Sequence, residues 1–208
     1  MPLYKSLQAD ENTRIKIWEI TEPFESLIKP LELRKVSHDR VMSMKSEIHR
    51  RGFLSVRHLL RAFNYTDDDL YYDSNGKPHL KDGKFISITH SFQYSGLIVS
   101  DHPVGIDIEK QRAKIGLIAK KFIDYEFQYL NNKDPHYVRK LTAIWCIKES
   151  LYKLFAQPGL SFKQHTMVIP FTFQDNKTVS WIDYNEYKSR YQSNYMEFEG
   201  FTCAYVLP

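Results

Sequence analysis

Two acidic residues alternate with two isoleucines in the segment GIDIEK, residues 105–110. If this segment is a β-strand, Ile106 and Ile108 share one face and Asp107 and Glu109 share the other. Two carboxylates would then point out together from an otherwise apolar strand, which makes them candidates for a functional site. An ordinary surface strand shows the same alternation. The segment by itself therefore leaves both interpretations open.

A second group of chemically active side chains recurs every four residues in a long predicted helix. Trp145, Glu149 and Lys153 share one side of this helix. The roughly opposite side carries an apolar stripe that should face a core, formed by Leu141, Ile144, Ile147, Leu151 and Leu154. If Glu149 and Lys153 faced water, they would form a solvated pair that contributes only about 0.2–0.5 kcal/mol. The tryptophan suggests instead that this second side is also covered, which would leave both charged groups at the edge of a cleft.

Helix and strand signals surround these segments in a repeated order. Hydrophobic periodicity predicts helices over residues 45–63, 117–130 and 137–157, and strands over residues 84–90, 95–100, 103–109, 165–173, 178–184 and 201–207. The short connections between the first three strands predict a small antiparallel meander. Helix then strands, followed by helix then strands, suggests two similar halves that join near Gly105.

Composition limits the classes of protein to which the chain can belong. With 208 residues, 42% of them hydrophobic and 14% aromatic, the chain can bury a substantial core. No apolar run approaches the roughly 20 residues of a membrane span, and the amino terminus lacks a secretory signal, so we expect a cytoplasmic protein with no membrane association. Cys146 and Cys203 are expected to be buried, reduced thiols. The net charge of +4 is modest, but basic residues cluster over residues 34–61, which favours a local anionic partner over nucleic acid.

Four sequence blocks in register resemble one enzyme family. The strand GIDIE begins at Gly105 and the helix WCIKESLYK begins at Trp145, while GKPHL and ISITHS occupy residues 76–80 and 86–91. These blocks are similar to those of the 4'-phosphopantetheinyl transferases that activate non-ribosomal peptide and polyketide synthetases, the surfactin-synthetase-activating type. The resemblance covers residues 50–161. Thr89 replaces the serine usual before the histidine of the fourth block, and Ser150 replaces the commoner alanine of the helix.

The resemblance implies a fold and a division of labour. Larger members of that family are α+β proteins built as a pseudo-dimer of two similar α/β halves, with the active site at the interface of the halves. In this chain the halves would be residues 1–104, which would bind the nucleotide and 3'-phosphate of coenzyme A, and residues 105–208, which would carry the magnesium and catalytic residues. A chain that contains both halves is expected to be a monomer.

The resemblance also implies a reaction. The phosphopantetheine arm of coenzyme A would move to a serine of an apo acyl or peptidyl carrier protein and release 3',5'-ADP. Asp107, Glu109 and Glu149 would hold Mg²⁺, an ion that prefers hard oxygen ligands and bridges to substrate phosphates. Lys153 would reach the diphosphate, and Glu149 or a metal-bound water beside it would take the proton of the serine. The catalytic residues would thus be Glu149, Lys153 and Asp107.

Cationic side chains would meet the phosphates of coenzyme A. The residues that the resemblance assigns to coenzyme A are Arg50, Arg51, Arg57, Lys77, Pro78, Thr89, His90 and Lys153. Lys148 may be read either as an aid to helix orientation or as a solvated lysine, and the second reading is favoured. Carrier proteins are generally acidic, so the basic stretch at residues 114–122 is a candidate docking surface, although an ordinary amphipathic helix has the same pattern.

Two other functions remain open from the sequence. A metal-dependent phosphohydrolase that acts on coenzyme A-like diphosphates could use three acids and a lysine in a similar way. A homologue without catalytic activity could bind carrier proteins with the same fold. None of the acidic residues of the family pattern is missing here, which favours the transferase.

Overall fold

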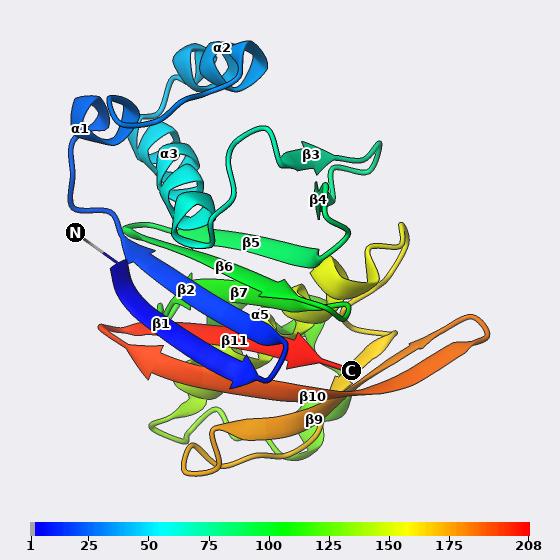
Figure 1. The fold of residues 1–208 in the computed structure, drawn as a ribbon. Helices are drawn as coiled ribbons and strands as arrows, with labels where there is room; N and C mark the ends of the chain where they lie inside the picture. Colours follow the sequence, from blue (N-terminus) through cyan, green and yellow to red (C-terminus); the bar gives the residue numbers. More distant parts are fainter. Residues whose placement is uncertain (1–2) are drawn as a thin grey trace. The chain divides into compact units, whose positions relative to one another are not determined.

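The computed structural model describes residues 3–208, and its chain forms two compact units, Met1–His102 and Pro103–Pro208 (Figure 1). The division falls close to the boundary between residues 104 and 105 that the sequence suggests. Each unit combines an antiparallel sheet with helices, in agreement with the mixed α and β architecture expected.

Unit 1 is built on a four-stranded antiparallel sheet in the order β1-β2-β6-β5. Its elements are β1 (Leu3–Asp10), β2 (Thr13–Glu19), α1 (Phe24–Ile28), α2 (Lys35–Ser43), α3 (Glu47–Ala62), β3 (Leu70–Tyr72), β4 (Pro78–Leu80), β5 (Phe85–Ser91) and β6 (Tyr94–Ser100). The helix predicted over residues 45–63 is confirmed as α3. The elements β1, β2, α1, α2, β3 and β4 were not predicted from the sequence.

Helix α3 lies on the sheet of unit 1 because its apolar side is buried there. Leu54, Leu59 and Leu60 of this helix are fully buried, as is Leu97 of β6. A small polar pair, Ser55 and Ser95, sits within the same interface with 2.6 Å between the two hydroxyl oxygens. Small side chains allow this close approach, and their mutual hydrogen bond removes the cost of burying them.

Unit 2 is built on a five-stranded antiparallel sheet in the order β7-β11-β10-β9-β8. Its elements are β7 (Gly105–Lys110), α4 (Ile115–Phe122), the 3₁₀ helix η1 (Tyr125–Gln128), α5 (Tyr137–Phe155), β8 (Thr166–Val168), β9 (Lys177–Tyr184), β10 (Tyr187–Phe198) and β11 (Phe201–Leu207). The helix predicted over residues 117–130 is thus two shorter helices. The longest strand, β10, was missed because its inward positions include Ser193 and its sequence carries few aliphatic residues.

The prediction of a three-stranded meander was wrong in its third strand. β5 and β6 do form a hairpin, but β7 belongs to the other sheet, where it pairs with β11 and sets Asp107 opposite Ala204. A strand pattern is local, whereas the partner of a strand depends on residues far away in the sequence. The short connection after β6 therefore leads out of unit 1 and is not a hairpin turn.

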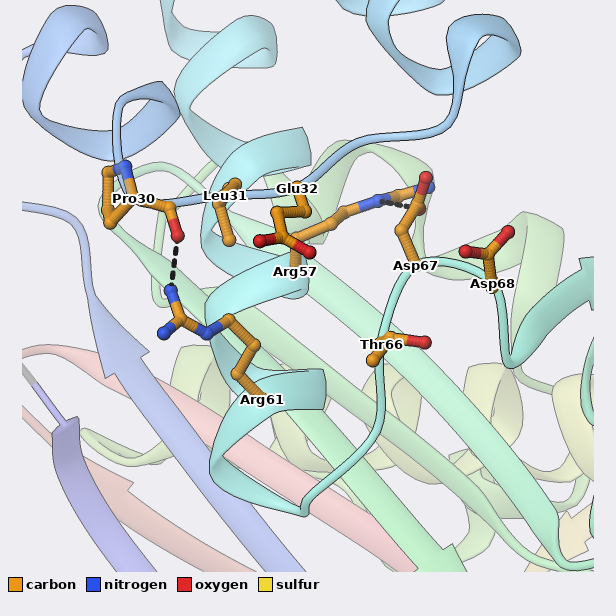
Figure 2. Close-up of a pocket in the computed structure, with 8 residues that line it drawn as sticks. All are labelled: Pro30, Leu31, Glu32, Arg57, Arg61, Thr66, Asp67 and Asp68. Atoms are coloured by element: carbon orange, nitrogen blue, oxygen red, sulfur yellow. Dashed lines mark hydrogen bonds and ion pairs between the residues drawn. The ribbon is translucent and has the colours of Figure 1, made fainter.

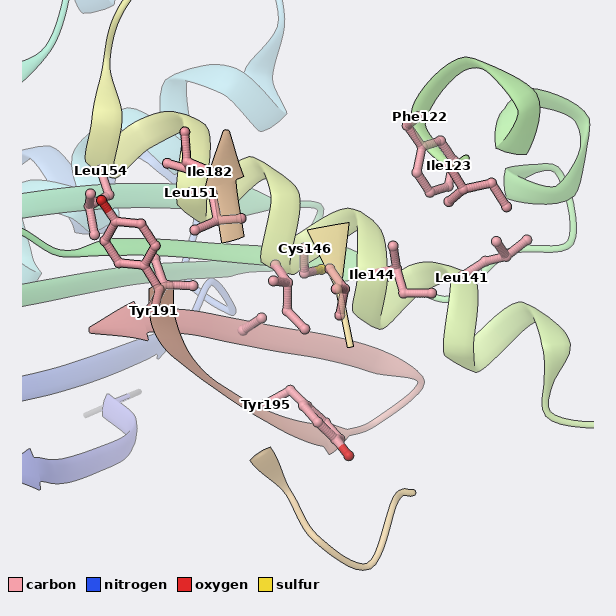
Figure 3. Packing of buried hydrophobic residues seen from close by; sticks show 14 of the residues in the cluster. Phe122, Ile123, Leu141, Ile144, Cys146, Leu151, Leu154, Ile182, Tyr191 and Tyr195 are labelled. Carbon is pink, nitrogen blue, oxygen red and sulfur yellow. The ribbon is translucent and has the colours of Figure 1, made fainter. Parts of the chain in front are cut away.

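Helix α5 provides the core of unit 2. The five residues of its predicted apolar stripe are all buried, and they pack with Ile182 and with Tyr191 and Tyr195 of β10 (Figure 3). The helix ends at Phe155, two residues before the predicted end at residue 157, and Ala156 then adopts the left-handed conformation with φ of 52°. The sequence prediction of this helix and of its inward face is confirmed.

Two further sequence predictions concern membranes and thiols. Among the residues that the structure describes, none of the helices combines the length and the apolar character that a membrane crossing requires. Cys146 and Cys203 are both buried, and neither forms a disulfide. Burial, with the nearby carboxylates of Asp107 and Glu109, raises the pKa of the Cys146 thiol well above its ordinary value, so this thiol is unreactive.

Candidate active site

The strand β7 and the helix α5 touch each other at Gly105. A Cβ atom added at this glycine would lie 1.9 Å from the backbone oxygen of Ser150, far closer than any real contact. Ser150 suits the same crossing because it is small and its hydroxyl donates back to the Cys146 oxygen at 2.7 Å. The glycine of GIDIE and the serine of WCIKES therefore let the strand and the helix approach closely, next to Asp107 and Glu149.

Asp107 and Lys153 form an ion pair across this crossing. The Lys153 Nζ donates to the Asp107 Oδ1 at 2.8 Å and to the Ile106 oxygen at 2.9 Å. The Asp107 side chain is only 8% exposed, whereas that of Lys153 is 27% exposed. Ile106 and Ile108 are fully buried, as the alternation predicted. The lysine is thus held by the strand, and it is not the solvated partner of Glu149.

The acidic side chains of this region influence one another. Burial raises the pKa of Glu149 to about 7, and the negative charges of Asp107 and Glu109 add to this rise. The positive charge of Lys153 offsets only part of the effect. Because repulsion of this kind requires proximity, the three carboxylates that the sequence analysis assigned to a metal share one electrostatic environment.

This environment suits a cation, although the carboxylates are not arranged around one. Within residues 3–208 no group of three histidine, cysteine or acidic side chains is close enough together to hold a metal ion. Asp107 instead contacts the ammonium group of Lys153. Carboxylate oxygens are the donors that Mg²⁺ prefers, and a divalent ion would relieve the repulsion that raises the pKa of Glu149. The donor set therefore fits the ion.

Lys148 departs most clearly from the sequence interpretation, which favoured a solvated side chain. Its side chain is fully buried, and its Nζ lies 2.8 Å from the Glu126 Oε1. The same Nζ also donates to the backbone oxygens of Phe122, Phe162 and Thr166 at 2.9, 2.9 and 3.0 Å. Lys148 therefore ties α5 to the segments on either side of it. Helical spacing was the available signal, because Lys148 lies four residues after Ile144 and three before Leu151, on the apolar side of α5. Residue type alone favoured a solvated side chain instead.

A pocket of about 370 Å³ lies in unit 1 beside α3. Residues of α2, α3, β3 and β5 form its walls, which are lined by Arg40, Met44, His49, Gly52, Phe53, Val56, Arg57, Tyr72, Ile88 and His90. Among these described lining residues none is acidic, whereas two are arginines and two are histidines. The pocket is therefore suited to an anion, and the ring of Tyr72 offers an aromatic surface at its rim.

The two histidines of this pocket lie close to each other and to α3. The ring centroids of His49 and His90 are 6.3 Å apart. Gly52 makes room for the ring of His90, because an added Cβ would lie 3.0 Å from its Cδ2 atom. His90 was identified from the sequence, whereas Arg40, His49 and Tyr72 were missed. The basic cluster over residues 34–61 was the signal for Arg40 and His49, but the sequence does not say which members of the cluster face inward.

The three arginines assigned to coenzyme A have different surroundings. Arg57 lines the pocket and is itself buried, with its guanidinium 3.6 Å from the ring centroid of Phe53. Arg50 lies over the ring of Phe24 at 3.7 Å, and Arg51 donates to the Ile20 oxygen at 2.8 Å. Neither of these two lines the pocket. The structure thus joins Arg57 and His90 in one pocket and directs Arg50 and Arg51 to contacts with α1 and the segment before it.

The remaining residues assigned to coenzyme A lie around this region of unit 1. Thr89 precedes His90 on β5 and is buried. Lys77 and Pro78 lie where the β3 to β4 hairpin turns, and the backbone of Lys77 pairs with Asp73 there. Burial lowers the pKa of Lys77, and the nearby charge of Asp73 opposes this effect. None of these three lines the pocket described above.

A smaller pocket of about 250 Å³ in unit 2 is lined by residues of β7, α4 and α5 and of the segment between β7 and α4. Glu109, Lys110, Arg112, Lys114, Ile115, Ile118 and Trp145 line it. Trp145 is partly buried against Phe122 and Phe162, with ring centroids 5.0 and 5.6 Å away. This partial burial of Trp145 confirms the prediction that its side of α5 is covered.

The chain is similar to known proteins of one family. Residues 103–206 match the family model described as the 4'-phosphopantetheinyl transferase superfamily. The 4'-phosphopantetheinyl transferase gsp of Aneurinibacillus migulanus is 28% identical to this chain over 168 residues. That alignment covers 74% of this chain and 65% of the relative, so the chain spans somewhat less than two thirds of the relative.

Proposed function

Since the chain belongs to the 4'-phosphopantetheinyl transferase superfamily, we propose that it transfers the phosphopantetheine arm of coenzyme A to a serine of an apo carrier protein. The products would be the holo carrier protein and 3',5'-ADP. The observation that supports this proposal is the close crossing of β7 and α5, where Lys153 pairs with Asp107 and where the charges of Asp107 and Glu109 act on Glu149.

We assign the metal to the three carboxylates Asp107, Glu109 and Glu149. Burial is the main cause of the raised pKa of Glu149, and the negative charges of Asp107 and Glu109 add to it. Carboxylates that repel one another in this way favour a divalent cation such as Mg²⁺. When bound, this ion would neutralise charge on the diphosphate of coenzyme A.

The side chains of α5 would act on the reacting groups. Lys153, whose ammonium group is partly exposed, would contact the diphosphate and stabilise the charge that develops as the bond to the leaving phosphate breaks. Glu149 would accept the proton of the attacking serine, which makes the hydroxyl a better nucleophile. The serine oxygen forms a bond to the β-phosphorus of coenzyme A, and 3',5'-ADP leaves with the electron pair of the broken bond.

The basic pocket of unit 1 would bind the 3'-phosphate of the same coenzyme A. His90 and Arg57 would be phosphate ligands, and Arg40 and His49 join them because they line the same walls. Thr89, Lys77 and Pro78 would contribute from the surrounding strand and hairpin. Arg50 and Arg51 would support α3 through the contacts that they already make.

We further propose that the two units form a pseudo-dimer with the active site at their interface, that the enzyme is a monomer, and that it works in the cytoplasm, where its two thiols would stay reduced. The carrier protein would dock on α4. Leu117 of this helix is 86% exposed, while Ala119 and Phe122 are buried. Lys114, Lys120 and Lys121 flank the exposed leucine, which suits an acidic partner.

The proposed reaction can be tested by mass spectrometry of a carrier protein. The protein, coenzyme A, magnesium and an apo carrier protein from the same host should together give a carrier whose mass has increased by one phosphopantetheine group. A carrier in which the acceptor serine is replaced by alanine should stay unmodified. If the wild-type carrier stays unmodified and coenzyme A stays intact, the protein is better described as a carrier-binding homologue without catalytic activity.

The same reaction mixtures distinguish a phosphohydrolase from a transferase. A hydrolase would release 3',5'-ADP from coenzyme A when no carrier is present, because water is then the acceptor. A transferase should release it only when the apo carrier is added. Equal release in both mixtures would contradict the proposal.

His90 offers a specific prediction about the 3'-phosphate. Dephospho-coenzyme A lacks only this group, so the wild-type protein should bind it more weakly than coenzyme A. A His90→Ala variant should reduce the ratio of the two affinities by about 10-fold, the value of one hydrogen bond to a charged group. Isothermal titration calorimetry measures both dissociation constants.

His102, an exposed residue outside the pocket, provides the matched control. A His102→Ala variant should keep the wild-type ratio. If His90→Ala weakens the binding of both cofactors equally, His90 supports the fold and is no phosphate ligand.

A further inference from the structure

One carboxylate in unit 1 contacts two separate segments, although it lies outside the basic pocket. Asp67 follows α3 in a turn and is only 5% exposed. Its Oδ1 accepts a hydrogen bond from the Arg57 Nε at 3.0 Å, and its Oδ2 accepts one from the Arg34 backbone N–H, also at 3.0 Å. Ser37 donates its hydroxyl to the same side chain. Asp67 therefore connects α3 to the start of α2.

We infer that Asp67 is a positioning residue for the 3'-phosphate of coenzyme A and acts through Arg57. This inference rests on the proposed function, because it concerns the basic pocket to which we assign that phosphate. Asp67 would hold Arg57 in one orientation and would fix the position of α2, which carries Arg40, another residue that lines the basic pocket.

The orientation of Arg57 supports this role. Figure 2 shows its side chain extending from α3 toward Asp67, in a second pocket of about 270 Å³ that adjoins α3. The bond to Asp67 uses Nε, which is one of the five N–H donors of a guanidinium group. Phe53 covers a face of the same group at 3.6 Å. An arginine held at its Nε and at its face keeps the outer Nη groups in a fixed direction, and such a fork suits phosphate oxygens.

The ionised state of Asp67 fits the same role. Burial opposes a charged carboxylate, but the Ser37 hydroxyl and the Arg57 charge more than compensate, so the pKa of Asp67 is lowered. A permanently charged partner keeps Arg57 fixed before any ligand binds. Fixing both partners in advance reduces the conformational entropy that phosphate binding would otherwise cost.

The test compares coenzyme A with dephospho-coenzyme A in an Asp67→Asn variant. The asparagine has the shape of the aspartate but lacks its charge, so Arg57 should lose its fixed direction. We expect the ratio of the two dissociation constants to fall about 10-fold, mainly through weaker binding of coenzyme A. A simple charge effect predicts the opposite, since removing a carboxylate near Arg57 would strengthen the binding of an anion. An equal or larger ratio in the variant therefore overturns the inference.

Asp68→Asn is the matched control, because it makes the same chemical change at the next residue. The Asp68 side chain is 70% exposed and lies 3.9 Å from the Arg34 Nε. This variant should keep the wild-type ratio. Thermal unfolding of both variants shows whether each is folded at the temperature of the titration.

If Asp67→Asn does not fold, Arg57→Lys decides the question. A lysine keeps a positive charge for Asp67, but its compact ammonium group cannot present the planar fork of a guanidinium to a phosphate. The same fall in the ratio is therefore expected, and an unchanged ratio overturns the inference. A wild-type protein that binds both cofactors equally would overturn the assignment of the pocket and this inference together. The carrier modification assay tests the transfer reaction separately from either result.

Discussion

A Gly105→Ala variant is expected to lose both stability and transfer activity. The added Cβ would meet the backbone oxygen of Ser150 at 1.9 Å, and no rotamer change can relieve a contact with backbone. The strand and the helix would have to separate by about 1.5 Å to reach an ordinary contact. Overpacking a dense core costs about 1–3 kcal/mol, and we expect the free energy of unfolding to fall by at least the upper value.

The loss of activity in this variant has a separate cause. Asp107 lies on the strand and Glu149 and Lys153 lie on the helix, so a separation of the two elements moves the reacting groups apart. A displacement of about 1 Å can reduce an enzymatic rate about 100-fold. Transfer to the carrier protein should therefore slow by at least that factor, even at temperatures where the variant is folded.

Gly116→Ala provides the control for stability. Gly116 lies in α4, and a Cβ added there would be 3.9 Å from the nearest atom of Tyr137, an ordinary contact. Because alanine favours a helix more than glycine does, this variant should be as stable as the wild type or slightly more stable. Wild-type stability and rate in Gly105→Ala itself would contradict the close approach of β7 to α5.

The second large effect concerns Lys148. A Lys148→Met variant should lower the free energy of unfolding by about 3–5 kcal/mol, because it leaves the carboxylate of Glu126 buried without its cation. Glu126 keeps only two hydrogen bonds, from the backbone N–H groups of Val168 and Asp124, at 2.9 and 3.2 Å. Chemical denaturation monitored by circular dichroism measures the change.

Two matched variants separate the buried charge from the lost side chain. Adding Glu126→Gln to Lys148→Met should restore much of the stability, since neither charge then remains in the core. Lys140→Met makes the same substitution in the same helix, but its ion pair with Asp134 is partly exposed and should cost only about 0–1 kcal/mol. Equal losses of stability at Lys140 and Lys148 would show that the buried ion pair of Lys148 stabilises the fold no more than the partly exposed ion pair of Lys140 does.

The sequence predicted the helices and the acidic segments better than it predicted the pairing of strands. The apolar stripe of α5 and the buried isoleucines of β7 follow from periodicity, which reports which face of an element meets a core. Periodicity does not predict that β7 belongs to the second sheet. Its pairing depends on β11, and nothing in the sequence of β11 indicates which strand it pairs with. The polar strand β10 was missed for a related reason, since periodicity recognises aliphatic alternation.

The candidate site shows the same limits at the level of single residues. Residue type and spacing predicted Asp107, Glu149 and Lys153, and the family resemblance predicted His90, but neither could tell which cations point inward. Lys148 illustrates this limit. Helical spacing puts it beside Ile144 and Leu151 of the apolar stripe, but its residue type favoured a solvated side chain, whereas four oxygen atoms surround its ammonium group in the core. Burial and partners of a charged side chain depend on segments that meet only in the fold.

The pairing of β7 with β11 also governs when the site can form during synthesis. β7 is the first strand of unit 2, and β11 is the last. The strand that carries Asp107 and Glu109 can therefore gain its hydrogen-bonded neighbour only after nearly all of unit 2 has left the ribosome. Unit 1 holds all of its own sheet partners and can fold earlier, since domains generally fold as units in the order of synthesis. A nascent chain arrested before β11 should thus contain a folded basic pocket but no assembled acidic centre.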